Sequence, residues 1–245
     1  MMRHSISSGW GSPPLHPVLD KDQVHLWLTW VDQAIAQVPQ LRQILSADEQ
    51  ARADRFHFER DRHRFTISRG RLRQILSRYL NTSAEQIQFC YGIHGKPSLA
   101  GSLANTGLQF NLAHSGEVVL CGVTRDRQIG VDVEQIRPLP KVHQLAERCL
   151  SLQEQNSLIN SNCPEETFLT YWTCKEAYLK AIGSGLSQPM DQIEFALTPK
   201  VQLQKVLGSS ETANLWSLQL LDLSASYKAA LAVEGQDYQL RCWEI

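Results

Sequence analysis

Residues 129–134 read Ile-Gly-Val-Asp-Val-Glu, and this alternation of apolar and polar side chains predicts a β-strand. Successive side chains of a strand point to opposite faces, so Asp132 and Glu134 share one face, about 7 Å apart along the backbone. The two valines then point into the core, and Gly130 leaves room beside the carboxylates. Adjacent carboxylates repel each other unless a cation, a proton or an arginine lies between them. The pair therefore indicates either a site for a hard divalent ion such as Mg2+ or the solvated face of an amphipathic strand.

A second stretch, residues 168–180, reads Phe-Leu-Thr-Tyr-Trp-Thr-Cys-Lys-Glu-Ala-Tyr-Leu-Lys and predicts a helix, because its large apolar residues recur at helical spacing. Glu176 and Lys180 are four residues apart and therefore share a face of that helix. Gly183 follows as a natural C-terminal cap. The Glu–Lys pair fits two interpretations, a surface ion pair or a third metal ligand beside a phosphate-binding lysine. Helical geometry alone leaves both open.

Strands and helices are mixed along the rest of the chain. A strand buried on both faces is predicted for residues 23–31, and a Ser-Ala-Asp-Glu capping box at residues 46–49 opens helical structure that continues to residue 79. Further strands are predicted at residues 108–112, 118–123 and 128–134, and helices at residues 141–150 and 165–182. The C-terminal third predicts a meander of antiparallel strands at residues 193–197, 215–221, 227–233 and 238–243. This order predicts an α+β fold in two halves, residues 1–125 and 126–245.

Arginine is concentrated in the first helical region. Residues 42–78 contain ten arginines, five acids and no lysine, a local excess of positive charge in a chain whose net charge is -1. These arginines fit a solvated helix face, or a patch that grips phosphate oxygens in bidentate fashion. A non-catalytic RNA-binding module is one function that such a patch could serve. The slightly negative overall charge argues against it, because dedicated nucleic-acid binders are usually basic.

Composition narrows the class of protein. The chain has 245 residues, of which 42% are hydrophobic and 20% charged, as expected of a globular protein. Its six cysteines form no close pair, which is typical of reduced thiols. No apolar run reaches the length of about 18 residues that is needed to cross a bilayer. We therefore expect a cytoplasmic protein that binds neither membranes nor nucleic acid.

Four blocks of sequence, taken together, resemble one family. The strand and helix described above resemble the two signature motifs of phosphopantetheinyl transferases, which lie some forty residues apart, as they do here. Two further blocks resemble the larger, surfactin-synthetase-activating (Sfp-like) type: Gly95-Lys-Pro-Ser98 and Phe110-Asn-Leu-Ala-His-Ser115. The resemblance extends from about Trp27 to Leu186. Each motif alone is weak, but four in the right order and spacing are specific.

The resemblance implies a fold and a reaction. Family members of this size are monomers with two similar α/β halves related by a pseudo-twofold axis, and coenzyme A binds in the cleft between the halves. The N-terminal half would then contact the nucleotide, and the C-terminal half would carry the metal and the catalytic helix. The enzyme would transfer the 4'-phosphopantetheine of coenzyme A to a serine of an apo acyl or peptidyl carrier protein. The products would be holo carrier protein and 3',5'-adenosine bisphosphate.

The resemblance also implies roles for individual residues. Asp132, Glu134 and Glu176 match the ligands of Mg2+, for which Mn2+ is the alternative metal. Glu176 and Lys180 would take part in catalysis. The residues expected to contact coenzyme A are Arg52, His94, Gly95, Lys96, Asn111, Ala113, His114 and Lys180.

One position departs from the family pattern. The family usually has serine before the histidine of the fourth block, and this chain has Ala113. A neutral hydrogen bond contributes only about 0.5–1.5 kcal/mol, so we expect a modest effect on coenzyme A affinity.

Carrier proteins are typically acidic around their serine, and Arg137 and Lys141 are candidates to meet them. Besides the RNA-binding module, the competing function is a magnesium-dependent nucleotide phosphohydrolase that uses the same carboxylates.

Overall fold

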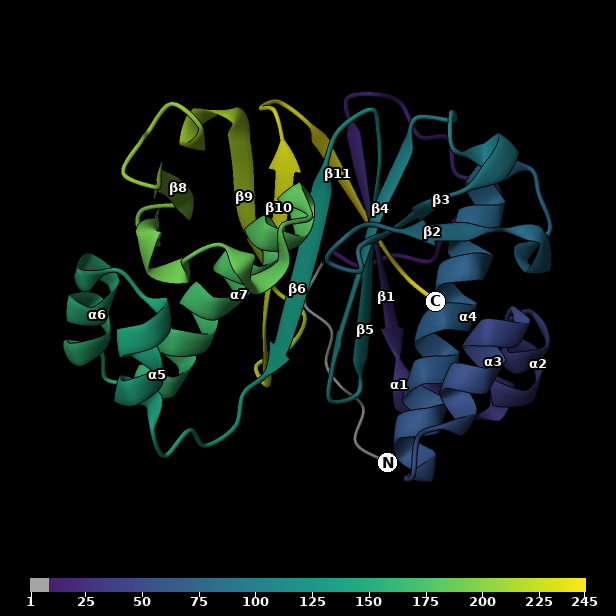
Figure 1. Ribbon diagram of the computed structural model, residues 1–245, viewed down its shortest axis with the longest axis horizontal. Coiled ribbons are helices and arrows are strands. Elements are labelled where there is room, and N and C mark those ends of the chain that lie inside the picture. The colour runs from purple at the N-terminus through teal and green to yellow at the C-terminus, as the bar shows by residue number, and fades with distance from the viewer. Residues whose placement is uncertain (1–8) are drawn as a thin grey trace.

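The computed structural model describes residues 9–245 and contains two main β-sheets, each covered by one long helix (Figure 1). The first sheet has the order β11-β1-β5-β4, with bounds β11 Gln239–Glu244, β1 Gln23–Trp30, β5 Val118–Arg125 and β4 Leu108–Ser115. The second sheet has the order β6-β10-β9, with bounds β6 Ile129–Gln135, β10 Tyr227–Glu234 and β9 Trp216–Leu221. Two small sheets pair β2 Phe89–Tyr91 with β3 Pro97–Leu99, and β7 Ile193–Ala196 with β8 Gln202–Val206. The helices are α1 Val31–Ala34, α2 Val38–Gln43, α3 Ala47–Asp54, α4 Glu59–Leu80, α5 Val142–Cys149, α6 Leu152–Ile159 and α7 Pro164–Ile182.

The same order of elements occurs twice along the chain. In the first half, β1 leads through short helices to the long helix α4, then to the small sheet β2–β3 and the antiparallel pair β4–β5. In the second half, β6 leads through α5 and α6 to α7, then to the small sheet β7–β8 and the antiparallel pair β9–β10. The orders within the two sheets also correspond, β1-β5-β4 and β6-β10-β9. The predicted α+β fold of two similar halves is confirmed.

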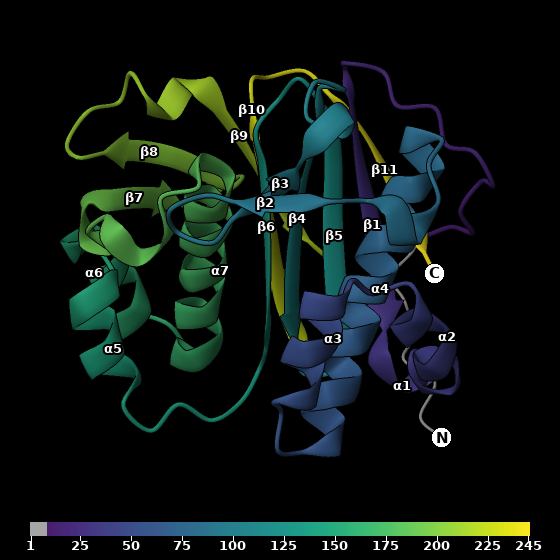
Figure 2. The same cartoon turned by 45° about the vertical axis from the view of Figure 1, so that its right-hand side comes forward.

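The last strand returns to the first half. Strand β11 lies parallel to β1 at the edge of the first sheet, with Leu240 opposite Val24 and Glu244 opposite Leu28 (Figure 2). The predicted C-terminal meander is therefore wrong in part, because only β9 and β10 pair within it and β7 pairs with β8. Alternation identifies a strand but not its partner, which can lie far away in the sequence. The division of the chain at residue 125 stays a prediction.

Other boundaries also differ from those predicted. The predicted continuous helix at residues 46–79 is interrupted at residues 55–58, and the strand predicted to end at residue 112 continues to Ser115. Helix α6 and strands β2, β3 and β8 were not predicted, because short elements carry little periodic signal. Within residues 9–245, the cysteines are all unpaired and no helix is both long and apolar enough to cross a membrane.

The two sheets pack face to face and bury the odd-numbered residues of β6. Val131 and Val133 lie in an apolar core with Leu26 and Leu28 of β1, as the alternation predicted. The even-numbered residues of β6 face helix α7 instead. Gly130 permits the contact, because a Cβ at this position would lie 2.0 Å from the carbonyl oxygen of Ala177 and 2.4 Å from the amide nitrogen of Ala181. The space predicted beside the carboxylates is thus filled by the backbone of α7.

A buried ion pair anchors α7 on its other side. The Lys175 ammonium lies 2.7 Å from Oε2 of Glu154, and both side chains are completely buried. Lys175 also donates to the carbonyl oxygens of Met190 and Ile193. Glu154 accepts from the amide of Ser151 at 2.8 Å and from that of Phe195 at 2.9 Å. Because every polar atom of this pair has partners, the network joins α6, α7 and β7 into one unit.

Replacing Lys175 with methionine should lower the free energy of unfolding by about 3–5 kcal/mol, because the buried Glu154 carboxylate would lose its counter-ion. The measurement is urea denaturation followed by circular dichroism. Lys205→Met is the matched control, since Lys205 pairs with Glu194 at 3.4 Å on the surface, where such a pair contributes about 1 kcal/mol or less. Equal losses in the two variants would contradict a structural role for Lys175.

Candidate functional site

Four residues of the predicted site lie on the two elements β6 and α7, which pack against each other. Asp132 and Glu134 come from β6, and Glu176 and Lys180 come from α7. The Lys180 ammonium donates to Oδ1 of Asp132 at 2.6 Å. The other oxygen, Oδ2, is buried and has no hydrogen-bond partner among the described residues. A buried oxygen without a partner is costly, so this position is suited to a further cation.

The electrostatics of these carboxylates also favour a cation. Burial raises the pKa of Asp132 to about 7; Lys180 opposes the shift, and the charges of Glu134 and Glu176 add to it. Burial likewise raises the pKa of Glu176, again opposed by Lys180 and reinforced by Glu134. The single ammonium of Lys180 therefore does not neutralise the three acids. The group is short of positive charge.

The side chains as they stand do not form a closed metal cage. Within residues 9–245, no three His, Cys, Asp or Glu side chains converge in a metal-binding arrangement. Mg2+ usually takes one or two carboxylates and completes its shell with water and substrate phosphate. The orphaned oxygen of Asp132 and the uncompensated acids fit such an open site.

Two basic side chains of the first half lie near the same region. His114 is exposed on β4, and desolvation by the surrounding protein lowers its pKa, with further lowering by the charges of Lys180 and Arg64. Arg64, on α4, lies 3.3 Å from Asp61 and 3.6 Å from Glu117. The charge of Lys180, from the second half, and that of Arg64, from the first half, thus both act on His114. Arg64 belongs to a stretch that resembles the family, but it was not among the residues predicted to contact coenzyme A.

A pocket of about 200 Å³ joins the two halves beside Lys180. Several of the predicted coenzyme A contacts line it: His94, Gly95, Lys96, Asn111 and Lys180. The Lys96 ammonium donates to the carbonyl oxygen of Ala181 at 2.7 Å and to that of Ile129 at 3.3 Å, so it bridges the halves. Burial lowers the pKa of Lys96 to about 8. The structure therefore brings these five predicted residues together.

Two predicted residues lie elsewhere. Arg52 is exposed on α3, and its guanidinium carbon lies 5.3 Å from the centre of the Phe65 ring. Ala113 is buried in the apolar core between the sheets. Because the alanine side chain can make no hydrogen bond, a polar contact between this residue and a ligand would involve its backbone.

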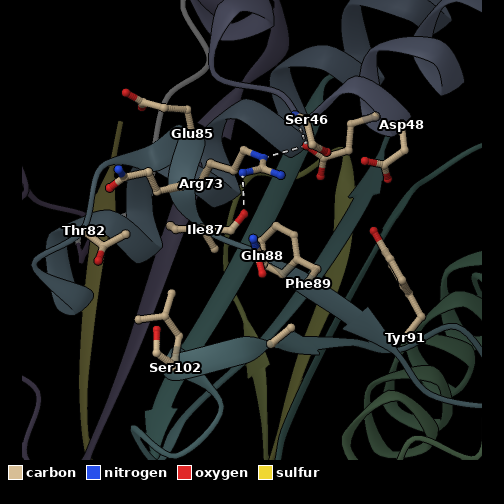
Figure 3. A pocket seen from close by; sticks show the side chains of 14 residues that line it. Ser46, Asp48, Arg73, Thr82, Glu85, Ile87, Gln88, Phe89, Tyr91 and Ser102 are labelled. Atoms are coloured by element: carbon tan, nitrogen blue, oxygen red, sulfur yellow. Dashed lines mark hydrogen bonds and ion pairs between the residues drawn. The ribbon is translucent and has the colours of Figure 1, made fainter.

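Part of the arginine-rich region serves the fold. Arg69 and Arg73 form ion pairs with the buried Glu49 carboxylate, with nitrogen–oxygen distances of 2.7 and 2.6 Å. Burial alone would raise the pKa of Glu49, but the two guanidinium groups outweigh it and hold the pKa below its usual range. Figure 3 shows Arg73 at a cavity of about 680 Å³, lined also by Ser46, Asp48 and Tyr91. This cavity is larger than the pocket beside Lys180, but it contains none of the predicted site residues.

Known proteins match nearly the whole chain. The family model described as 4'-phosphopantetheinyl transferase superfamily matches residues 128–232, and the one described as 4'-phosphopantetheinyl transferase, N-terminal, matches residues 30–125. The 4'-phosphopantetheinyl transferase HetI of Nostoc sp. is 41% identical over 99% of each chain. The 4'-phosphopantetheinyl transferase Sfp of Bacillus subtilis is 26% identical over 79% of this chain and 84% of its own.

A solved structure adds a weaker likeness. A holo-(acyl-carrier-protein) synthase from Bacillus anthracis, in complex with coenzyme A, covers 44% of this chain and 96% of its own at 24% identity. Its TM-score of 0.37 is too low to support a conclusion. The identity to the Nostoc protein along the whole chain, together with the two family models, is decisive. The chain belongs to the 4'-phosphopantetheinyl transferase superfamily.

Proposed function

We propose that this protein transfers the 4'-phosphopantetheine of coenzyme A to a serine of an apo carrier protein. The observation that carries the proposal is the buried Asp132 carboxylate, which lies beside Glu134, Glu176 and the ammonium of Lys180, with His114 close to Lys180. Such a group can bind a divalent ion and a pyrophosphate side by side, as phosphoryl transfer requires. The matched relatives are named for the same reaction.

Asp132, Glu134 and Glu176 are the residues that would hold Mg2+, with Mn2+ as the alternative metal. The orphaned Oδ2 of Asp132 supports this assignment, because it lacks any other partner among the described residues. When bound, the metal would neutralise charge on the pyrophosphate of coenzyme A. Its charge would also offset the repulsion by Glu134 and Glu176 that adds to the effect of burial on the pKa of Asp132.

The remaining residues have roles that follow from charge and position. The carrier serine hydroxyl attacks the β-phosphate, its oxygen–phosphorus bond forms, and the bond to 3',5'-adenosine bisphosphate breaks. Glu176 is the candidate to accept the hydroxyl proton, because its carboxylate lies on the face of α7 that meets the carboxylates of β6. Lys180 would stabilise the negative charge that develops on the phosphates. His114 and Arg64 would bind phosphate from the first half, and His94, Gly95 and Lys96 would line the nucleotide pocket.

Further sequence predictions belong to this proposal. Arg137 and Lys141 are both exposed just after β6, where they can meet an acidic carrier protein. Arg52, Asn111 and Ala113 are proposed coenzyme A contacts, of which Asn111 lines the pocket. We also propose that the nucleotide contacts come chiefly from residues 1–125 and the metal site from residues 126–245. The monomeric state and the cytoplasmic location stay predictions.

Mass spectrometry of the carrier protein tests the function. Incubation of the chain with coenzyme A, Mg2+ and an apo carrier protein should add the mass of one phosphopantetheine to the carrier. A nucleotide phosphohydrolase would instead consume coenzyme A and leave the mass of the carrier unchanged. Unchanged mass across acyl and peptidyl carriers would refute the transferase.

Asp132→Asn and Glu176→Gln should each lower kcat at least about 100-fold, because the metal site supplies several kcal/mol of charge stabilisation. The rate of carrier modification measures the effect. Glu165→Gln is the matched control, since Glu165 lies in the first turn of the same helix, away from the carboxylate group. Near-normal rates in the Asp132 or Glu176 variant would rule out the metal assignment.

The stability gained from Mg2+ should rise with pH. In the metal-free fold the pKa of Asp132 is raised from 3.8 to about 7, so the folded protein keeps a proton that the unfolded chain has released. The contribution of Asp132 to stability is therefore lost as the pH rises toward 7, and Mg2+ replaces the proton. The increase in Tm on adding Mg2+ should be larger at a pH of about 8 than at about 6. In Asp132→Asn this difference should disappear; its persistence there would assign the proton to another group.

A further inference from the structure

The carboxylate strand β6 is an edge strand. It pairs with β10 on one side, and no main-chain ladder joins its other side to the first sheet. In an antiparallel pair, successive residues direct their peptide groups to alternate edges of the strand. The peptide groups of Ile129, Val131 and Gln135 point away from β10, toward the first half of the molecule. An unpaired edge of this kind needs other partners when it is buried.

Side chains of the first half supply those partners. Oδ1 of Asn111 accepts from the amide of Val131 at 2.9 Å, and Asn111 is only 4% exposed. The Lys96 ammonium donates to the carbonyl oxygen of Ile129 at 3.3 Å. Further along, Oγ of Ser115 accepts from the amide of Gln135 at 3.1 Å. Asn111 and Ser115 lie four residues apart on β4, so their side chains share the face that meets β6.

Ser115 makes a second contact that reaches the carboxylates directly. Its hydroxyl donates to Oε2 of Glu134 at 3.0 Å while its oxygen accepts from the adjacent amide. One side chain thus holds both the backbone and the carboxylate of this part of the strand. This arrangement needs a hydroxyl, because the same oxygen must donate a hydrogen bond to Glu134 and accept one from the amide of Gln135.

We infer that Ser115 and Asn111, with Lys96, are positioning residues that clamp the free edge of β6 and thereby hold Glu134 and Asp132 in place for the metal. This inference rests on the proposed function, but it assigns a different role to Asn111 and Lys96 than contact with coenzyme A alone. Oδ1 of Asn111 is already occupied by the strand, and the Lys96 ammonium already faces backbone oxygens. Ser115 had no assigned role in the sequence pattern.

The clamp should affect metal binding more than nucleotide binding. Groups that orient metal ligands typically change metal affinity or activity about 10–100-fold when they are removed. In Ser115→Ala, Glu134 loses its hydrogen bond and the end of β6 loses an anchor. Ser115→Thr keeps the hydroxyl, so both contacts can form again. The pair of variants therefore separates the hydroxyl from the mere size of the side chain.

The test compares wild type, Ser115→Ala and Ser115→Thr. We expect Ser115→Ala to raise the Mg2+ concentration for half-maximal rate about 10-fold and Ser115→Thr to restore it to within about twofold. The KM for coenzyme A at saturating Mg2+ should change less than about twofold, because the nucleotide contacts are intact. Direct binding of Mn2+, measured by electron paramagnetic resonance in the presence of 3',5'-adenosine bisphosphate, should weaken by the same factor as the Mg2+ dependence. Ser157→Ala, on the exposed side of α6, is the control that should change neither quantity.

Unchanged Mn2+ affinity in Ser115→Ala would overturn the inference, as would failure of Ser115→Thr to restore it. A raised KM for coenzyme A with normal metal affinity would also overturn it and place Ser115 among the nucleotide contacts. A wild-type protein that modifies no carrier would refute the proposed function instead, and the Mn2+ measurement would still decide whether Ser115 orients the acidic site.

Asn111→Ala provides an independent check on the middle of the strand. It leaves the amide of Val131 without its acceptor, so hydrogen exchange of the peptide that contains Val131 should become faster in the folded protein. Mn2+ affinity should fall together with this loss of protection. Faster exchange with unchanged Mn2+ affinity would show that the contact is structural only and would contradict positioning by Asn111.

Discussion

The close packing of helix α7 on strand β6 is the contact on which the candidate site depends. The backbone of α7 comes so near to Gly130 that no side chain could fit between them. This approach places Lys180 within hydrogen-bond distance of Asp132 and buries the carboxylate. Burial and the two neighbouring acids then leave Asp132 with a raised pKa and an unpartnered oxygen. A single packing contact therefore sets both the geometry and the charge deficit of the site.

The candidate site contains residues from both halves of the molecule. The first half supplies the basic residues His114 and Arg64 and the bridging residue Lys96. It also supplies the side chains that bond to the free edge of β6, Asn111 and Ser115. The three acids come from the second half, whereas the proposed phosphate-binding residues come from both halves. The geometry of the site therefore depends on how the two halves pack. The face-to-face core between the sheets fixes that packing.

Adjacent residues of the signature helix have opposite roles for a simple geometric reason. Lys175 and Glu176 are neighbours in sequence, but successive residues of a helix point about 100° apart. Lys175 therefore enters the core and pairs with Glu154, while Glu176 faces the carboxylate strand. The arginines of α4 divide in the same way, since Arg69 and Arg73 are used inside the fold by Glu49 and Arg64 faces the site. The two arginines that pair with Glu49 are therefore not available to bind an RNA phosphate.

The sequence by itself determined the α+β class, the strand at residues 129–134, the helix at residues 168–180 and the family, because these depend on local periodicity and on motif order. Strand and helix geometry paired Asp132 with Glu134 and Glu176 with Lys180, and the resemblance to the family joined the two pairs into one predicted site. Only the tertiary structure decided that β11 joins β1, that Arg64 faces the site, that Ala113 points into the core and that Ser115 bonds to Glu134. Each of these is a contact between residues distant in the chain. Such contacts depend on the packing of whole sheets and leave no trace in local sequence patterns.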